Sequence, residues 1–255
     1  MQSILGQNKD LFELIVMDGA STDDTLDSIR KFENDLTLVS EKDGGVYQAF
    51  NKGIELAKGK YIYFIGAGDC LRPGVLEQVK ELLPMETPAL VYGNCYFTKQ
   101  NFFDGREFSI ADFTWTNICH QGEFYHREIF DIVGKYDLRY KVFADWLLNL
   151  KCFLHPGINN RYFPLYIADY EENGLSSRID KDPAFKKDFP RFVRRELGFK
   201  AFIVCQTKML HPDSYFFTHG LIYGLGYEIL RYFLPVARPF VRSYRSLKKT
   251  LTDSK

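Results

Sequence analysis

The sequence lacks the charge imbalance, the cysteine patterns and the leader segment that would assign it to several common protein classes. Its 33 Lys and Arg residues balance 33 Asp and Glu residues, so no net charge favours binding to nucleic acid. The five cysteines form no C-x-x-C pair and have no neighbouring histidines in a zinc pattern, which predicts reduced, mostly buried thiols in a cytoplasmic protein. No basic segment followed by an apolar one opens the chain, so no signal peptide is expected.

Three nucleotide and hydrolase motifs are also missing. There is no G-x-x-x-x-G-K-[ST] phosphate loop and no G-x-G-x-x-G at the start of a helix, so neither a P-loop nor a dinucleotide fingerprint is present. The G-x-S-x-G motif of serine hydrolases is absent as well.

What the sequence does contain is a regular alternation of apolar runs and amphipathic segments. The 255 residues suffice for one large α/β domain or a domain with an appendage. Strands are predicted at residues 13–17, 36–40, 61–65 and 89–92, and helices at 21–32, at 46–58 and after Pro73. This order predicts a mostly parallel sheet covered by helices on both faces.

The rest of the chain is less regular. Residues 94–118 suit antiparallel strands and loops, and residues 128–133 and 145–153 suit short helices. We therefore expect one domain over residues 1–200 and a helical extension over residues 201–255.

The extension has an apolar, aromatic segment at 216–236, interrupted by Glu228 and Arg231, and a basic tail at 231–255. The interruptions make it a poor membrane-spanning helix. It suits either a segment lying on an anionic membrane surface or a helical cap docked on the domain.

Three acidic residues follow predicted strands: Asp18, Asp43 and Asp69. Ligands of parallel α/β sheets bind beyond the carboxyl ends of the strands, so these carboxylates are expected in one crevice, although each taken alone suits a turn or cap. Carboxylates there suit Mg²⁺ or Mn²⁺ bound to a diphosphate, and Gly66 and Gly68 would allow the diphosphate to approach the backbone. With the other motifs absent, metal-assisted use of a nucleotide diphosphate is favoured.

Four blocks of the chain stand out by their order and spacing: "ELIVMDGASTDDTLDSI", "SEKDGGVYQAFNKGIELAKGKYIYFIGAGDCL", "ICHQGEFYHREIFDIVGKYDLRYKVFADWLLNL" and, more weakly, "ENGLSS". In these blocks the chain resembles family 2 glycosyltransferases of the GT-A fold, particularly the bacterial branch that assembles exopolysaccharide and O-antigen chains. These blocks cover most of residues 3–177. The resemblance implies a Rossmann-like GT-A sheet flanked by helices.

The resemblance also implies roles for individual residues on the donor side. Asp69 matches the last acid of the metal-binding D-x-D-type motif and would coordinate Mn²⁺ or Mg²⁺, while Gly66 and Gly68 replace further polar residues of that motif. Asp18, Asp43 and Gly68 would bind the nucleotide sugar. A single carboxylate binds a divalent metal more weakly than two carboxylates do.

On the acceptor side, Asp145 matches the position of the catalytic base. It would remove the proton of the attacking acceptor hydroxyl, and a single in-line displacement would invert the anomeric carbon. From the residues alone, without the family resemblance, a helix N-cap is the preferred explanation of Asp145. His120 and Gln121 are expected to position the acceptor, and Trp146 would either stack on a sugar or fill the core.

The function implied is metal-dependent, inverting sugar transfer from a UDP-, GDP- or dTDP-linked donor in cell-surface polysaccharide or glycolipid biosynthesis. A lipid-linked or oligosaccharide acceptor and a cytoplasmic, peripheral membrane location are expected, and no nucleic-acid partner. One alternative is a non-catalytic nucleotide-sugar binding or assembly subunit. Another is a nucleotidyltransferase, but the Gly- and Lys-rich N-terminal loop that it requires is absent.

Members of the family usually begin with an inner strand and a "TPTYN"-type loop, whereas this sequence begins at the following helix, "QSILGQNKDLF". We expect a chain extended upstream to be more stable and to bind donor more tightly, because an inner strand pairs with two neighbours. Equal melting temperatures for the two chains would contradict this expectation.

Overall fold

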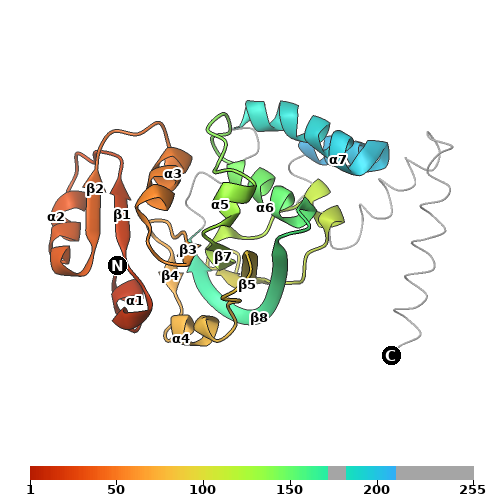
Figure 1. The fold of residues 1–255 in the computed structure, drawn as a ribbon. Coiled ribbons are helices and arrows are strands. Elements are labelled where there is room, and N and C mark those ends of the chain that lie inside the picture. The colour runs from red at the N-terminus through yellow and green to blue at the C-terminus, as the bar shows by residue number, and fades with distance from the viewer. Residues whose placement is uncertain (172–181, 211–255) are drawn as a thin grey trace. The chain divides into compact units, whose positions relative to one another are not determined.

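The computed structural model describes residues 1–171 and 182–210 (Figure 1). The chain divides into two compact units, Met1–Met209 and Leu210–Lys255, and all of the second unit except Leu210 lies outside the described residues. The apolar segment 216–236 and the basic tail 231–255 therefore lie outside them too. Within the described part of the chain, no helix has the length and apolar character needed to cross a membrane.

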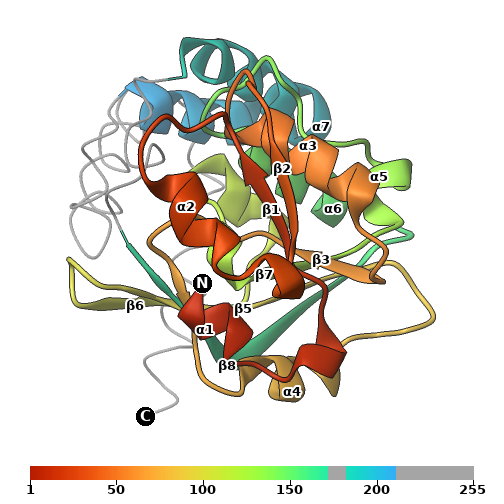
Figure 2. The same cartoon turned by 90° about the vertical axis from the view of Figure 1, so that its left-hand side faces the viewer.

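A small parallel sheet forms the N-terminal part of the first unit. Strands β1 and β2 pair in parallel, with Asp18 opposite Ser40, so the loops that follow both strands leave the same edge. Helices α2 and α3 lie on opposite sides of this sheet (Figures 1 and 2). The elements in order are α1 (Gln2–Leu5), η1 (Lys9–Leu11), β1 (Ile15–Asp18), α2 (Thr25–Arg30), η2 (Glu33–Asp35), β2 (Thr37–Ser40) and α3 (Val46–Leu56).

The central sheet has six strands in the order β3-β7-β5-β8-β4, with β6 paired to β5. They are β3 (Tyr61–Tyr63), β4 (Cys70–Leu71), β5 (Ala89–Phe97), β6 (Phe102–Asp104), β7 (Glu123–His126) and β8 (Asn159–Tyr170). The α/β class is confirmed, but the sheet is mixed, which corrects the expectation of a mostly parallel one. The β5–β8 pairing is parallel, and the four others within the described residues are antiparallel.

The physical reason is the position of β7. This strand comes from the less regular second half of the chain and runs antiparallel to both β3 and β5, between which it lies. Strands β3 and β5 therefore run in the same direction, as the strand–helix alternation predicts, without being hydrogen-bonded neighbours.

Both faces of the central sheet are covered. Alternate residues of β5 enter different hydrophobic clusters, because neighbouring side chains of a strand point to opposite faces: Leu90 joins one cluster, and Val91 the other. The remaining helices are α4 (Val75–Lys80), η3 (Ile110–Thr114), η4 (His120–Gly122), α5 (Ile129–Ile132), α6 (Ala144–Leu154) and α7 (Pro183–Leu210). The expected boundary at residue 200 lies inside α7, whereas the compact units meet at residues 209 and 210.

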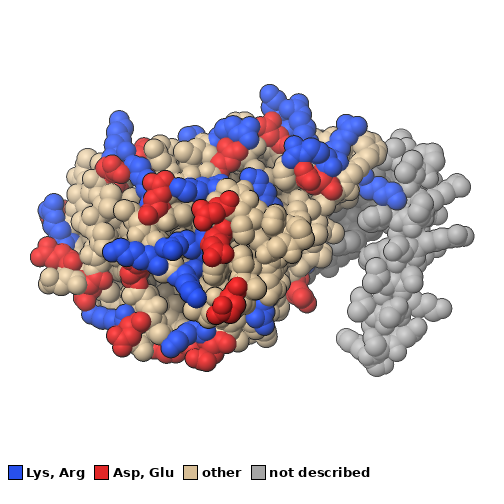
Figure 3. All heavy atoms as spheres, in the orientation of Figure 1, with Lys and Arg blue, Asp and Glu red and all other residues tan. Residues whose placement is uncertain are grey.

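On the face of the molecule in Figure 3, described Lys and Arg side chains are interspersed with Asp and Glu side chains. The charge balance of the whole chain is thus also a local one on this face.

Candidate functional site

Asp69 lies in the turn that follows β3, with both carboxylate oxygens held by neighbouring groups. Its Oδ2 accepts hydrogen bonds from the backbone N–H of Gly66 at 3.2 Å and from Nε2 of Gln121 at 2.8 Å. Its Oδ1 accepts one from the backbone N–H of Glu171 at 2.9 Å. Burial raises the pKa of Asp69, and the hydrogen bond from Gln121 opposes that rise. The turn therefore holds a partly dehydrated carboxylate in one orientation.

Gly68 allows a second carboxylate to approach this turn. Its φ is +100°, and a Cβ atom there would lie 2.6 Å from Oε2 of Glu171, closer than non-bonded atoms come. Glu171 also carries a negative charge near enough to raise the pKa of Asp69. Two adjacent carboxylates fit a hard divalent cation with oxygen ligands, so Asp69 and Glu171 could hold Mg²⁺ or Mn²⁺. The described residues contain no group of three or more potential metal-ligating side chains.

Asp145 lies in the first turn of α6 and is partly buried. Its Oδ1 accepts a hydrogen bond from the hydroxyl of Tyr47 at 2.8 Å, and its Oδ2 accepts one from Nδ2 of Asn117 at 3.0 Å. Burial raises the pKa of Asp145, and His120 and the Tyr47 hydroxyl act against that rise. The N-cap of α6 is Phe143, so the alternative of Asp145 as the cap does not hold.

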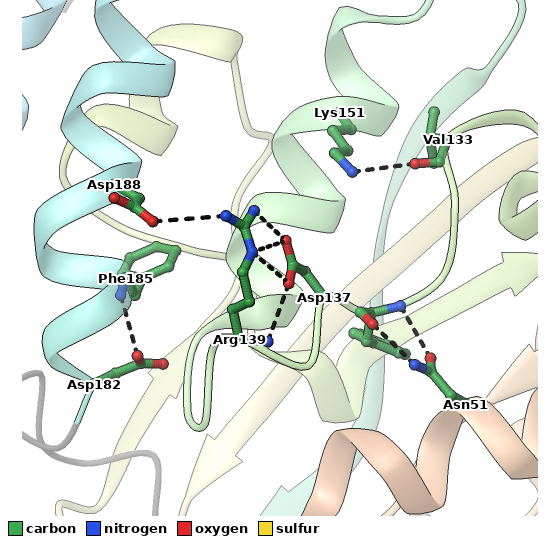
Figure 4. A network of polar contacts seen from close by, with 9 residues as sticks. Asn51, Val133, Asp137, Arg139, Lys151, Asp182, Phe185 and Asp188 are labelled. Carbon is green, nitrogen blue, oxygen red and sulfur yellow. Dashed lines mark hydrogen bonds and ion pairs between the residues drawn. The ribbon is translucent and has the colours of Figure 1, made fainter.

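The loop before α6, residues 133–143, contacts α3 through Asn51 on one side and α7 through the Arg139–Asp188 ion pair on the other (Figure 4). Asn51 of α3 forms two hydrogen bonds with the backbone of Tyr136, at 2.9 and 3.0 Å. Asp182, next to α7, accepts a hydrogen bond from the backbone N–H of Val142 at 2.9 Å. Helices α3 and α7 thus fix the start of α6 and the carboxylate that it carries.

A single 3-10 turn, η4, connects the surroundings of Asp69 and Asp145. Gln121 of this turn donates to Asp69, as described above, and is itself buried. His120, the preceding residue, interacts electrostatically with Asp145. Burial lowers the pKa of His120, which keeps the ring neutral near pH 7, since an unperturbed histidine titrates near pH 6.5.

Asp18 and Asp43 lie at the edge of the small sheet, where their loops meet. Oδ2 of Asp18 accepts hydrogen bonds from the backbone N–H of Ser21 at 3.1 Å and from Oγ of Ser40 at 2.6 Å. The Ser21 hydroxyl also donates to Oδ1, and these hydrogen bonds lower the pKa of Asp18. A Cβ atom at Gly19 would lie 3.2 Å from Oδ2 of Asp43. The structure therefore brings Asp18 and Asp43 together, with Asp18 the more fully engaged by the protein.

A pocket of about 170 Å³ opens between the first turn of α3 and residues 138–141. Tyr47 lines this pocket and also contacts Asp145. The volume is below the roughly 300 Å³ typical of small-molecule sites, so the pocket suits part of a ligand.

Trp146 lies in the core and not at the site. It is 5% exposed, its Nε1 donates to the backbone oxygen of Phe113 at 2.9 Å, and its ring packs against Phe185 and Phe189. A buried ring has no free face for a sugar. This corrects the expectation that Trp146 positions the acceptor. The other expectation, that Trp146 fills the core, agrees with its burial.

Sequence reasoning missed three residues of this site: Tyr47, Asn117 and Glu171. Glu171 directly follows β8, so the rule that singled out acids after strands could have found it. Tyr47 and Asn117 carry no signal in the sequence, because their role depends on contacts with a residue 98 and 28 positions away, respectively.

Comparisons with known proteins agree with this arrangement. The family profile described as "Glycosyl transferase family 2" matches residues 1–143. A "PGL/p-HBAD biosynthesis glycosyltransferase" from Mycobacterium tuberculosis is 38% identical over 211 residues, which cover 80% of this chain and 82% of the relative.

Two solved structures share the fold at low sequence identity. S. aureus TarS 1–349 in complex with UDP-GlcNAc superposes with a TM-score of 0.60 at 14% identity, over 86% of this chain and 71% of that one. The mannosyltransferase PcManGT from Pyrobaculum calidifontis, in complex with GDP-Man and Mn²⁺, gives a TM-score of 0.56 at 17% identity, over 100% of this chain and 82% of that one.

Proposed function

The chain belongs to glycosyl transferase family 2, and from that premise we propose that it is a metal-dependent transferase that inverts the anomeric carbon of a nucleotide-sugar donor. Sugar transfer in glycan biosynthesis follows from the family. The donor class is supported by two proteins of the same fold, which were solved with UDP-GlcNAc and with GDP-Man and Mn²⁺.

On the donor side, Asp69 and Glu171 would hold the divalent cation, and the hydrogen bond from Gln121 would keep the Asp69 carboxylate oriented. When bound, such a cation neutralises the charge that develops on the leaving diphosphate. Gly68, which has no side chain, leaves room for Glu171 beside the backbone and would contribute to the donor site by placing that carboxylate next to Asp69. Asp18 and Asp43, at the adjoining loops, would accept hydrogen bonds from the base or ribose.

The observation that carries the proposal is the position of Asp145. The residue is partly buried, its carboxylate has a raised pKa, and it lies across η4 from the Asp69 turn. A base must be near the acceptor hydroxyl and on the opposite side of the sugar from the leaving group. Asp145 suits this role, and His120, neutral beside it, would help to position the acceptor.

We further propose a lipid-linked or oligosaccharide acceptor and action at the cytoplasmic face of the membrane, in the synthesis of cell-surface polysaccharide or glycolipid. The support is the composition of the tail at 231–255, whose basic residues suit an anionic lipid surface. Flotation of the full chain with anionic vesicles, compared with neutral vesicles, tests this part. Equal recovery with both would contradict it.

The transfer proposal is tested by incubating the purified protein with Mn²⁺ and a panel of UDP-, GDP- and dTDP-sugars and measuring release of nucleoside diphosphate. We expect release from one donor, lost in Asp69→Ala and strongly reduced in Asp145→Asn. Asp27→Asn, on the exposed surface of α2, is the matched control and should release at the wild-type rate. Donor binding without release, even with candidate acceptors present, would support the non-catalytic alternative instead.

A further inference from the structure

A hydrogen-bonded chain runs from Asp145 into the core and ends at a second carboxyl group, that of Glu123. Asn117 donates to Asp145 and accepts through its Oδ1 from Nδ2 of Asn149 at 3.0 Å. The same Nδ2 lies 2.5 Å from Oε1 of Glu123. The hydroxyl of Tyr125 closes the chain, 2.7 Å from Oε2 of Glu123 and 2.7 Å from Oδ1 of Asn149.

The direction of each hydrogen bond in this chain follows from its outer end. When Asp145 is ionised its Oδ2 can only accept, so the amide N–H of Asn117 must point to it and the Asn117 carbonyl must point inward. That carbonyl needs a donor, so Asn149 turns its Nδ2 toward it. The two hydrogens of this Nδ2 then serve Asn117 and Glu123, and the Asn149 carbonyl is left facing Tyr125.

If Glu123 is ionised, the hydrogen-bonded chain contains fewer polar hydrogens than its contacts require. Tyr125 has one hydroxyl hydrogen but lies at hydrogen-bonding distance from two oxygens, Oδ1 of Asn149 and Oε2 of Glu123. With an ionised Glu123, one of these 2.7 Å contacts would join two acceptors. A proton on Oε2 of Glu123 completes the set, because it is donated to Tyr125, which in turn donates to Asn149.

We infer that Glu123 is a neutral carboxylic acid at physiological pH and is a positioning residue, acting through Asn149 and Asn117, for the carboxylate of Asp145. The positioning role rests on the proposed function, whereas the protonation of Glu123 does not.

The surroundings of Glu123 agree with the hydrogen count. The side chain is fully buried, and within the described residues it takes part in no ion pair with Lys or Arg. The ionisable groups that face it are Asp145, Tyr92, Tyr125, Tyr136 and Cys152, none of which is a cation. Burial, and after it the charge of Asp145, raise the pKa of Glu123 well above its usual range.

The role of this acid follows from its complete burial and from its hydrogen bonds to Asn149 and Tyr125. A protonated carboxyl both accepts from Asn149 and donates to Tyr125, so it satisfies both neighbours without a buried charge. The amide of Asn149 is thereby fixed, which in turn fixes the N–H that Asn117 directs at Asp145. The inner acid thus sets the orientation and the proton affinity of the outer one.

The protonation is tested without any substrate. The infrared spectrum of the full chain at pH 7, compared with that of Glu123→Gln, should contain a carbonyl band of a protonated carboxylic acid that the variant lacks. Absence of this band from the difference spectrum would overturn the inference, whether or not the protein transfers sugar.

The positioning role is tested with transfer assays as a function of pH. Gln can accept and donate as a protonated Glu does, so Glu123→Gln should keep the rate within about threefold, whereas Glu123→Leu should lose about tenfold or more, the equivalent of one hydrogen bond. Tyr125→Phe should raise the pH at which the transfer rate increases. Without the Tyr125 hydroxyl, Asn149 and Asn117 are held less firmly, so the hydrogen bond from Asn117 stabilises the ionised form of Asp145 less.

Tyr61→Phe is the matched control for Tyr125→Phe, since its hydroxyl donates to the backbone oxygen of Pro84 outside the chain. Tyr61→Phe should leave the pH dependence of the transfer rate unchanged. A loss in Glu123→Gln as large as in Glu123→Leu, or equal profiles for both Tyr→Phe variants, would overturn the positioning role.

Discussion

The hydroxyl oxygen of Tyr47 lies 2.8 Å from Oδ1 of Asp145 and 2.5 Å from the backbone oxygen of Val142. One hydroxyl hydrogen therefore has two acceptors. When it points to Asp145 it stabilises the carboxylate, and when it points to Val142 it leaves an oxygen lone pair for a protonated Asp145. This arrangement suits a base, because a base passes through both protonation states in each reaction cycle.

We predict that Tyr47→Phe slows transfer by about tenfold, the equivalent of one charge-assisted hydrogen bond. Because the Tyr47 hydroxyl lowers the pKa of Asp145, its removal should also shift the rise of the rate to higher pH. Steady-state rates across pH measure both effects, with Tyr61→Phe as the control. An unshifted profile with a full rate would show that Tyr47 only packs.

We predict that the rate of transfer rises with pH. The base must be ionised to accept a proton, and the pKa of Asp145 is raised above its ordinary value of 3.8 by burial. Below the folded-state pKa the base is protonated and transfer is slow; above it transfer reaches a plateau. Measurements of kcat at saturating donor and Mn²⁺ should show this limb in the wild type, whereas the residual rate of Asp145→Asn should lack it.

We predict that Asp145→Asn lowers kcat by about 10²- to 10⁴-fold, the usual contribution of a general base, while donor affinity changes little. Calorimetric titration with the donor and Mn²⁺ measures the affinity separately. Loss of donor binding together with the rate would instead assign Asp145 to the donor pocket.

We predict that Gly68→Ala destabilises the fold by about 1 to 3 kcal/mol and weakens metal-dependent donor binding, because a Cβ there meets Glu171 and the backbone has φ +100°. Gly134→Ala is the matched control. Its φ of +85° imposes a similar backbone cost, but its Cβ would meet no atom within 4 Å. Urea unfolding should show a cost in both variants, and donor titration a loss in Gly68→Ala alone. Equal donor affinities for Gly68→Ala and Gly134→Ala would show that Gly68 lies outside the donor site.

We predict that the stability of the wild type falls relative to Glu123→Gln as the pH rises. Below the ordinary glutamate pKa of 4.5, Glu123 is protonated both folded and unfolded. Above it, the unfolded chain releases the proton while the folded chain retains it, so folding loses about 1.4 kcal/mol per pH unit until the raised folded-state pKa is reached. Urea unfolding between about pH 4 and pH 8 measures the difference; a constant difference would mean that folded Glu123 ionises normally.

The sequence by itself determined the strand–helix order of the first half and the acids that follow its strands. Local patterns suffice there, since apolar runs and Gly-Asp turns depend on neighbours in the chain. The family blocks likewise singled out Asp69 and Asp145 as candidate site residues, because the order and spacing of motifs can be read from a linear sequence.

Only the tertiary structure decided how these residues meet. The insertion of β7 between β3 and β5, the contacts of Tyr47 and Asn117 with Asp145, and the burial of Trp146 all join segments far apart in the chain. The proton on Glu123 follows only from counting hydrogens in contacts among β7, α6 and the η3–η4 loop. No local pattern contains such contacts, because long-range packing selects among many arrangements that the same propensities allow.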